Sequence, residues 1–427
     1  MKKFLYATTA LASVGMIAGA ASDAAAAEKI RLGLSGYHQQ FVNYTSQDID
    51  TPSNCGVAGN GCIAGTGNKV KTNNVDQKHN SEICVIGETT LDTGITIGVN
   101  VQIEANTSGD NIDESYLYVQ HANYGQVILG DENNAGYLLH VTAPDGGINV
   151  DSGDLVNLEL WNNTANQQYF NTAVGTTNLR FNDNDSGKIT YISPRFFGVQ
   201  AGISYIPETE NSGGDDNNGA YFNNTPYGRS GAGNNKQFHN LVAGGLNYKQ
   251  DFSGFGVQLS LGAMQGQNGQ TSNAAGFSGS DLFAWNGGAQ FSFAGFKFGG
   301  AYVSAPNKNV VQGNLTQTSN ATGATSTTPQ SMQSNGWTVG GAYEWGPYAV
   351  GLTYQHGESE GTFIYNQDTR LDQVVLSGTY TLGPGIRFVG GFFGYDADAE
   401  KTPGNGPTYT GFDNSGWGAV TGLKLSF

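Results

Sequence analysis

A regular alternation of apolar and polar residues constrains this chain more than any other feature. Its clearest example lies between Gly94 and Asn106, where every second residue is apolar: Ile95, Ile97, Val99, Val101, Ile103 and Ala105. Successive side chains of a β-strand point to opposite faces, so the pattern predicts strands with one apolar and one polar face. The same alternation returns in residues 197–205, 255–263, 337–345, 348–354 and 417–427.

The connections between these segments distinguish a membrane barrel from a soluble β-sandwich, whose strands alternate in the same way. Tight turns, such as LDTG at 91–94 and FAGF at 293–296, alternate with long stretches poor in apolar residues, such as 305–333 and 396–414. Seven tight turns and eight longer loops make fifteen connections and hence sixteen strands. Bacterial membrane barrels combine an even strand number with short periplasmic turns and longer external loops. We therefore predict an all-β fold, a closed 16-stranded antiparallel transmembrane β-barrel.

The first residues of the chain predict export. Lys2 and Lys3 precede an apolar stretch of small residues, and the run Ala25-Ala26-Ala27 suits cleavage by a signal peptidase. We expect residues 1–27 to be a cleaved signal peptide and residues 28–427 to form a single barrel domain. Beyond residue 27, no stretch of the sequence approaches the ~18 to 20 apolar residues that a spanning helix needs.

Charge and motif content exclude several classes of function. The signal segment carries two Lys and one Asp, so the mature chain keeps 17 basic and 34 acidic side chains, a net charge of about −17. This balance argues against nucleic-acid binding, which needs clustered Lys and Arg. The sequence has no Walker loop, GxSxG, HExxH or CxxC motif, and its six histidines are scattered. We therefore expect no enzyme activity, no metal site and no cofactor.

The segment from Asp131 to Gly187 is far longer than the ~12 to 15 residues beyond which a structureless loop needs a functional reason. We expect this third loop to fold into the lumen, which a barrel of ~16 strands leaves open to water. Its acidic side chains would then form the loop side of a pore constriction: Asp145, Asp151, Asp154 and Glu159.

Basic side chains of the strands are expected to line the wall that faces this loop. Alternation points four of them into the lumen: Arg31, Lys188, Lys297 and Lys424. We add Arg387 to this wall, although its strand alternates poorly. The first and last strands pair when the barrel closes, so we expect Arg31 and Lys424 to be neighbours near the periplasmic rim. Four acidic side chains also point inward: Glu82, Glu88, Glu104 and Glu344. Together with the acidic excess, they predict a modest cation preference.

Three segments, at residues 121–140, 188–207 and 418–427, carry a resemblance to a known family. Over essentially the whole mature chain, the sequence resembles the Gram-negative general porins, most closely their alphaproteobacterial branch. HANYGQVILGDENNAGYLLH (121–140) is similar to the turn and strand that lead into the family's constriction loop. KITYISPRFFGVQAGISYIP (188–207) is similar to the hairpin that leaves that loop. GAVTGLKLSF ends the chain on Phe427, and the family's barrels end on a Phe that the barrel assembly machinery recognises.

The resemblance implies a homotrimer in the outer membrane of a Gram-negative cell, in contact with its lipid and lipopolysaccharide. It also implies nonspecific passage of ions and small hydrophilic solutes, and it places Arg180, in NLRFNDND, near the constriction. The second loop departs from the pattern. In the family it often latches onto the neighbouring subunit, but here residues 107–112 give only about six residues.

Other functions stay open at this point. A channel selective for a sugar or for an anion such as phosphate would need a ladder of aromatic residues or a cluster of Arg and Lys on the lumen face, and alternation shows neither. An adhesive barrel could use the Ser-, Thr- and Asn-rich stretch 314–333. A membrane enzyme could use only His121 or His140 with an Asp of the third loop. Cys55 and Cys62 could pair in the first loop, which leaves Cys84 in a strand.

Overall fold

The computed structural model of the chain describes residues 29–50, 73–106, 112–151, 153–157, 160, 175–181, 183, 186–209, 238–268, 280–307, 311–318, 325–331, 333–360, 368–398, 402–403, 409–410 and 413–427. The predicted signal peptide, residues 1–27, lies outside the described residues, and so do Cys55, Cys62 and Glu159. Cys84 is a free thiol in a strand.

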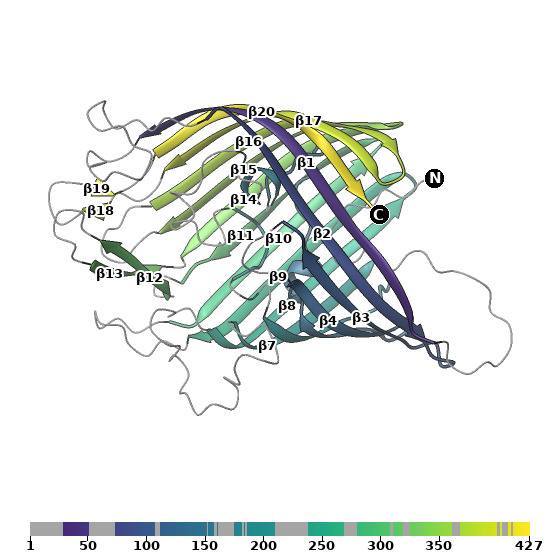
Figure 1. Cartoon of the computed structure of the whole chain (residues 1–427). Helices are drawn as coiled ribbons and strands as arrows, with labels where there is room; N and C mark the ends of the chain where they lie inside the picture. The colour runs from purple at the N-terminus through teal and green to yellow at the C-terminus, as the bar shows by residue number, and fades with distance from the viewer. Residues whose placement is uncertain are drawn as a thin grey trace.

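Sixteen strands form one closed barrel, in which neighbours in chain order pair antiparallel and the last strand, β20, closes on the first, β1 (Figure 1). The predicted fold and strand number are therefore confirmed. The barrel strands are β1 (Arg31–Asp50), β2 (Val75–Thr90), β3 (Thr96–Glu104), β4 (Ile112–His121), β5 (Gly125–Asp131), β6 (Gly187–Ile192), β7 (Val199–Glu208), β8 (Phe238–Phe252), β9 (Phe255–Asn268), β10 (Leu282–Phe293), β11 (Phe296–Ala305), β14 (Ser334–Trp345), β15 (Tyr348–Glu360), β16 (Asp368–Gly383), β17 (Ile386–Asp398) and β20 (Asp413–Ser426).

The register at the closure differs from the expectation. Lys424 pairs with Gln39 of β1 and with Arg387 of β17, whereas Arg31 lies eight residues before Gln39 and pairs with Glu88 of β2. The prediction that Arg31 and Lys424 are neighbours was therefore wrong. The physical reason is the shear of a closed barrel: its strands tilt and stagger, so the first residues of β1 extend past the end of β20.

Side chains alternate between the lumen and the outer surface along the strands. On β15, Thr353 and Gln355 face inward and are buried, while Val350 and Leu352 are exposed on the outer surface. Because closure gives each strand a neighbour on both sides, the backbone N–H and C=O groups pair within the sheet, as hydrocarbon requires. The apolar outer surface and the fully paired backbone of the closed sheet are both typical of a membrane-spanning barrel.

Aromatic rings gather at two levels of the outer surface. Beside a tight turn, Trp345 stacks on Tyr348 with ring centroids 5.6 Å apart. Near the opposite ends of the strands, Trp285 packs against Tyr302 with centroids 5.2 Å apart. Amphipathic rings favour the boundary between membrane and water, so the two levels mark the edges of the apolar band.

Two small sheets lie outside the barrel, at the end opposite the C-terminus (Figure 1). β12 (Val311–Thr318) pairs with β13 (Thr325–Ser331), and β18 (Thr402–Pro403) pairs with β19 (Tyr409–Thr410). They fall in the stretches 305–333 and 396–414, which we predicted only as long loops. The larger sheet is rich in Thr, which favours strands even where no apolar alternation marks them.

The third loop carries two single-turn helices, α1 (Ala135–Leu138) and α2 (Asp154–Asn157). Each has four residues, so neither contributes a helical layer to the fold. Within the described ranges, no helix has the length and apolar character needed to cross a membrane.

Candidate functional site in the barrel lumen

The described part of the third loop lies inside the barrel. Thr353 Oγ1 on β15 donates to the carbonyl of Pro144 at 2.8 Å, and Thr379 Oγ1 on β16 donates to that of Gly146 at 2.7 Å. On β9, Ser260 Oγ accepts from the backbone N–H of the loop at residue 141, at 2.9 Å. Strands far apart around the barrel therefore hold the same loop.

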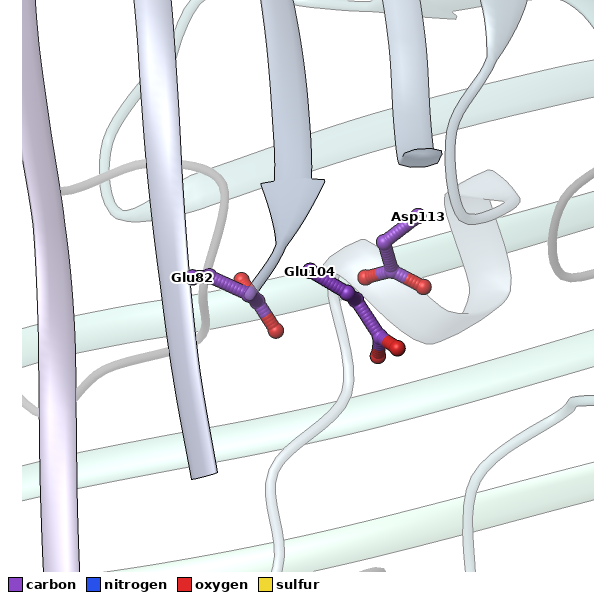
Figure 2. A group of neighbouring side chains, drawn as sticks. All are labelled: Glu82, Glu104 and Asp113. Carbon is purple, nitrogen blue, oxygen red and sulfur yellow. The ribbon is translucent and has the colours of Figure 1, made fainter. Parts of the chain in front are cut away.

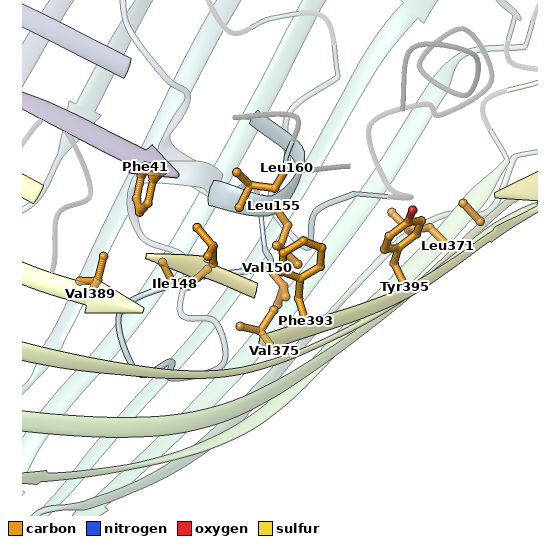
Figure 3. Packing of buried hydrophobic residues seen from close by; sticks show 12 residues of the cluster. Phe41, Ile148, Val150, Leu155, Leu160, Leu371, Val375, Val389, Phe393 and Tyr395 are labelled. Atoms are coloured by element: carbon orange, nitrogen blue, oxygen red, sulfur yellow. The ribbon is translucent and has the colours of Figure 1, made fainter. Parts of the chain in front are cut away.

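Apolar packing fixes the loop against the wall. Four loop residues, Ile148, Val150, Leu155 and Leu160, form a buried cluster with inward side chains of β1, β16, β17 and β20 (Figure 3): Phe41, Leu371, Val375, Val389, Phe393, Tyr395, Ala397 and Val420. A second buried cluster joins two later loop residues to inward side chains of β7 to β11: Leu179 and Phe181 with Ile206, Phe238, Leu241, Ala243, Met264, Leu282, Ala284, Val303 and Ala305. Burial of each large aliphatic side chain contributes about 1.5–3 kcal/mol. The lumen wall is thus apolar where the loop covers it.

The loop backbone also passes directly against the wall at a pair of glycines. A Cβ added at Gly351 of β15 would stand 2.5 Å from the Gly146 nitrogen, and a Cβ added at Gly146 would stand 2.4 Å from the Gly351 nitrogen. Neither atom is a movable side-chain end, so this approach requires glycine on both sides.

Asn134 ties the entry of the loop to its exit. Its side chain caps α1 by accepting from the Tyr137 N–H at 3.1 Å. The same side chain donates to the Leu179 carbonyl and to Asp183 Oδ2, both at 2.7 Å. Asn134 is only 1 % exposed, so these hydrogen bonds are shielded from water.

Lys188 lies at this loop base. Its ammonium group donates to the carbonyls of Glu132 and Ser186, the latter at 2.6 Å, and its side chain is buried. Burial raises the pKa of Glu132, against the opposing attraction of the Lys188 cation. The structure therefore places this predicted wall residue among the contacts that hold the loop.

Asp154 and Lys424 form a direct ion pair between the loop and the wall. Their Oδ2 and Nζ atoms are 2.7 Å apart, and the side chains are 7 % and 13 % exposed. Arg387 is the cross-strand neighbour of Lys424. Burial raises the pKa of Asp145, while the Lys424 and Arg387 cations and a hydrogen bond from the Gly147 N–H lower it. Four of the predicted charges, two from the loop and two from the wall, thus lie close together.

Asp151 bonds within the loop instead. Its carboxylate accepts from the hydroxyls of Thr142 and Thr177, and from the Thr177 N–H at 2.7 Å. His140 continues this network: its Nε2 is 2.9 Å from Thr177 Oγ1, and its Nδ1 is 3.0 Å from Asn286 Nδ2 on β10. Burial lowers the pKa of His140 to about 4, although the Asp151 carboxylate acts in the opposite direction. The imidazole is therefore neutral at pH 7.

The other predicted basic residues have contacts of their own. Lys297 on β11 forms an ion pair with Glu344 on β14, at 2.6 Å. Arg31 has a glutamate of β2 as its cross-strand partner. Arg180 lies near Tyr137. Burial raises the pKa of the Tyr137 hydroxyl, and the Arg180 guanidinium lowers it.

Three carboxylates gather on the lumen wall at β2 to β4 (Figure 2). Glu82, Glu104 and Asp113 each offer an oxygen within 4.8 Å of the others, and the Tyr37 hydroxyl donates to Glu82 Oε1 at 2.5 Å. Glu82 and Glu104 were predicted to face inward, but Asp113 was missed because strict alternation along β4 points it outward. A register shift in the β3–β4 pairing breaks the alternation there. Such a group also suits a divalent cation, so the absence of a metal site stays a prediction.

A pair of aromatic rings also faces the lumen. Tyr116 and Tyr118 lie on the inward face of β4 with ring centroids 6.4 Å apart. The Tyr118 hydroxyl donates to Glu88 at 2.7 Å. The sequence predicts that the lumen face carries no ladder of aromatic residues, and this pair does not contradict that prediction. Both rings are buried, at 7 % and 5 % exposure, and two covered rings are not a ladder.

Comparisons with known proteins agree with this architecture. The profile of the family described as Gram-negative porin matches residues 7–400. No curated protein sequence matches the chain. The fold is similar to an anion-selective porin from Comamonas acidovorans, at 16% identity over 93% of this chain and 100% of that chain, with a TM-score of 0.53. It is also similar to a loop L8 deletion mutant of OmpT, an outer membrane protein of Vibrio cholerae, at 11% identity over 94% and 100% of the two chains, with a TM-score of 0.51.

The two structural similarities establish the fold alone, because their sequence identities are low. They do not distinguish branches of the family, so the alphaproteobacterial assignment stays a prediction. The family profile, in contrast, spans most of the sequence. The chain belongs to the Gram-negative porin family and is a porin of the outer membrane.

Proposed function

We propose that this porin forms a water-filled channel for passive diffusion of ions and small hydrophilic solutes, with a weak preference for cations. The group of Glu82, Glu104 and Asp113 carries the selectivity, because three carboxylates on the lumen wall attract cations and repel anions. The ammonium groups of Lys424 and Lys297 lie 2.7 and 2.6 Å from carboxylates, which cancel much of their field. The field of these three carboxylates in the lumen therefore outweighs that of the two paired ammonium groups.

The charges of this chain support a preference for cations. The barrel fold by itself favours neither cations nor anions. One of the similar structures is an anion-selective porin, so the same barrel can hold either selectivity. Here the whole chain carries a formal net charge of −16, and the acidic excess grows by one if the predicted signal peptide is removed. Selectivity is therefore expected to follow the residues of the lumen.

The proposed pore needs no catalytic step and no cofactor. Its partners are the outer-membrane lipid and lipopolysaccharide around the barrel, two further copies of the chain in a homotrimer, and the barrel assembly machinery. Phe427 supports the last of these, because its side chain is 66 % exposed. Its backbone is paired with Gly36 in both directions, at 2.9 and 3.0 Å, so the ring is held at a fixed place on the barrel.

A sugar-selective channel is the alternative that one observation favours. Tyr116 and Tyr118 face the lumen and could stack on a sugar ring. Both are buried, so a sugar would reach them only if the surrounding side chains moved. We therefore favour the nonspecific pore.

Single-channel recording in a planar lipid bilayer tests the proposal. We expect large current steps whose size rises in proportion to the KCl concentration, and closure in three equal steps at high voltage. Heat-denatured protein is the control and should give no steps. An electrically silent barrel, or a current blocked by one particular sugar at low concentration, would contradict a nonspecific pore.

A further inference from the structure

A small hollow opens on the outer surface of the barrel where β8, β9 and β10 reach their external ends. Its volume is about 180 Å³, far above the ~10–15 Å³ that a site needs to hold one water molecule. The hollow therefore has room for a group of several heavy atoms. The residues that line it are mostly polar: Asn240, Val242, Gln265, Gly266, Gln267 and Asp281. We call this site the β8–β10 hollow.

A β-bulge shapes the hollow. The pairing of β8 with β9 shifts between His239 and Val242, so Asn240 and Leu241 together face Gly266. Leu241 is buried in the second lumen cluster, and a Cβ added at Gly266 would stand 2.4 Å from its Cγ. Asn240 is exposed on the outer surface with a φ of 52°, which asparagine tolerates better than most residues. The bulge thus presents an amide group at the edge of the hollow.

Several polar groups of the hollow keep hydrogen-bonding capacity. The Tyr205 hydroxyl donates to Asn240 Oδ1 at 2.8 Å, and Asn240 Nδ2 donates to Gln267 Oε1 at 2.9 Å. These bonds leave the side-chain N–H groups of Gln267 as donors. Asp281 uses Oδ1 to accept from a backbone N–H at 3.2 Å, which leaves Oδ2 as an acceptor. Among the described residues, the Gln265 side chain has no hydrogen-bond partner.

The hollow lies just beyond the apolar band of the outer surface. On its membrane side, Leu246 and Leu261 are cross-strand neighbours and are 50 % and 55 % exposed. Trp285, which packs against Tyr302 at the external edge of the band, lies four residues after Asp281 on the same face of the barrel. The β8–β10 hollow therefore faces the polar head groups of the outer leaflet, where hydrocarbon tails have ended.

We infer that the β8–β10 hollow binds a sugar ring in the head group of an outer-leaflet glycolipid. Sugar hydroxyls both donate and accept, which matches the amides of Gln265 and Gln267 beside the carboxylate of Asp281. Phe283 is the cross-strand neighbour of Gln265 and is 39 % exposed, so its ring offers an apolar surface for the face of a sugar. The choice of glycolipid rests on the proposed contact with lipopolysaccharide, and the hollow assigns a place for that contact.

The charges of the hollow favour the sugar over the phosphates of such a lipid. The described residues that line it include no Lys, Arg or His. Asp281 contributes a carboxylate, which repels an anionic phosphate and attracts hydroxyl donors. Recognition at this site is therefore expected to follow the sugar part of the head group.

Lipid titrations of the purified porin, followed by native mass spectrometry, test this site. One probe is dephosphorylated lipid A, which keeps the sugar rings of the head group, and the other is phosphatidylglycerol, which carries a phosphate but no sugar ring. We expect the glycolipid to bind about tenfold more tightly than the phospholipid. Gln265→Leu combined with Gln267→Leu should remove this difference. Equal affinities in the wild type, or a difference that survives in the double variant, would overturn the assignment.

The matched control is Asn335→Leu, near the external end of β14. Asn335 also carries an amide, but it lies outside the hollow and donates to Glu358 at 2.8 Å. We expect this variant to keep the preference for the glycolipid. A loss equal to that of the double variant would show that any polar side chain near the external rim has the same effect, and would also overturn the assignment.

Asp281→Asn distinguishes a sugar from a phosphate as the bound group. If the hollow holds a sugar, the variant should bind dephosphorylated lipid A more weakly and phosphatidylglycerol no better. Tighter binding of phosphatidylglycerol would instead assign the hollow to phosphate. Single-channel conductance separates this site from the proposed pore, because the hollow lies outside the lumen: the variants should conduct like the wild type. Unchanged glycolipid binding in conducting variants would reject only the hollow, whereas a silent wild type would reject only the pore.

Discussion

The Lys424 ammonium group lies 2.7 Å from Asp154 Oδ2, so the last strand of the barrel holds the third loop through an ion pair. The carboxylate is presented by a local turn: Asp154 Oδ2 also accepts from the Asn149 N–H at 3.1 Å, and the Asp154 N–H donates to the Asn149 side chain at 2.8 Å. The ion pair therefore joins a preformed turn of the loop to a fixed position on the wall.

Breaking this pair should change the ion selectivity. Asp154→Asn leaves the Lys424 cation without its partner, so we expect the ratio of cation to anion permeability to fall below that of the wild type. The reversal potential in a KCl gradient measures this ratio. Asp92→Asn removes a carboxylate from the exposed turn between β2 and β3 and is the control. Equal changes in the two variants would show that the lumen position has no special effect.

Deleting residues 145–159 should raise the single-channel conductance. The deletion removes Ile148, Val150 and Leu155, which anchor the loop in the lumen cluster, together with Asp154. Without them we expect a wider path for ions through the barrel. A heat-induced mobility shift on a gel would check that the variant still folds. Unchanged conductance in a folded variant would mean that the loop does not restrict the pore.

Asn134→Ala should loosen the base of the loop. The substitution leaves the Leu179 carbonyl and the Asp183 carboxylate without their buried donor, and each lost hydrogen bond of this kind costs about 1–3 kcal/mol. We expect faster proteolytic cleavage between residues 131 and 187 in the folded barrel. Asn123→Ala, in the exposed turn between β4 and β5, is the control. Equal cleavage rates for both variants would argue against a role of Asn134 at the loop base.

His140 predicts a pH dependence of stability. Its pKa is lowered to about 4 by burial, below the ~6.5 of a free histidine. As the pH falls, the histidine of the unfolded chain therefore takes up its proton before that of the folded chain. The free energy of unfolding keeps the full contribution of His140 above pH ~6.5 and loses it as the pH falls toward 4, by about 3 kcal/mol at most. His140→Gln should remove this part of the pH dependence of guanidinium unfolding, whereas His121→Gln should keep it. An unchanged dependence in the His140 variant would contradict the burial of a neutral ring.

The barrel was predictable from the sequence because its signals are local. Alternation marks each strand within about ten residues, and tight turns such as FAGF at 293–296 mark the hairpins. The turn at Ala294 and Gly295 has positive φ values of 51° and 88° at both positions, as a two-residue hairpin turn requires. Counting such signals gives the number of strands and shows at which end of the barrel the tight turns lie.

The arrangement inside the lumen was less predictable because it depends on contacts between distant segments. Val375 and Phe393 are apolar residues on the inward face, which a water-filled lumen does not explain. The loop residues Ile148 and Leu155 cover them in the structure. The position of Asp113 depends on a register shift that no local pattern marks. Barrel shear likewise separates Arg31 from Lys424, which would be neighbours if the first and last strands paired without stagger.

The reversal potential of the wild-type protein, measured in a planar bilayer across a KCl gradient at pH 7, tests the central claim most directly. We predict a potential whose sign shows that K⁺ permeates faster than Cl⁻. It should become smaller when Glu82→Gln, Glu104→Gln and Asp113→Asn are combined, because those three carboxylates supply the selectivity. A wild-type potential of zero, or one of the opposite sign, would contradict a cation-preferring pore.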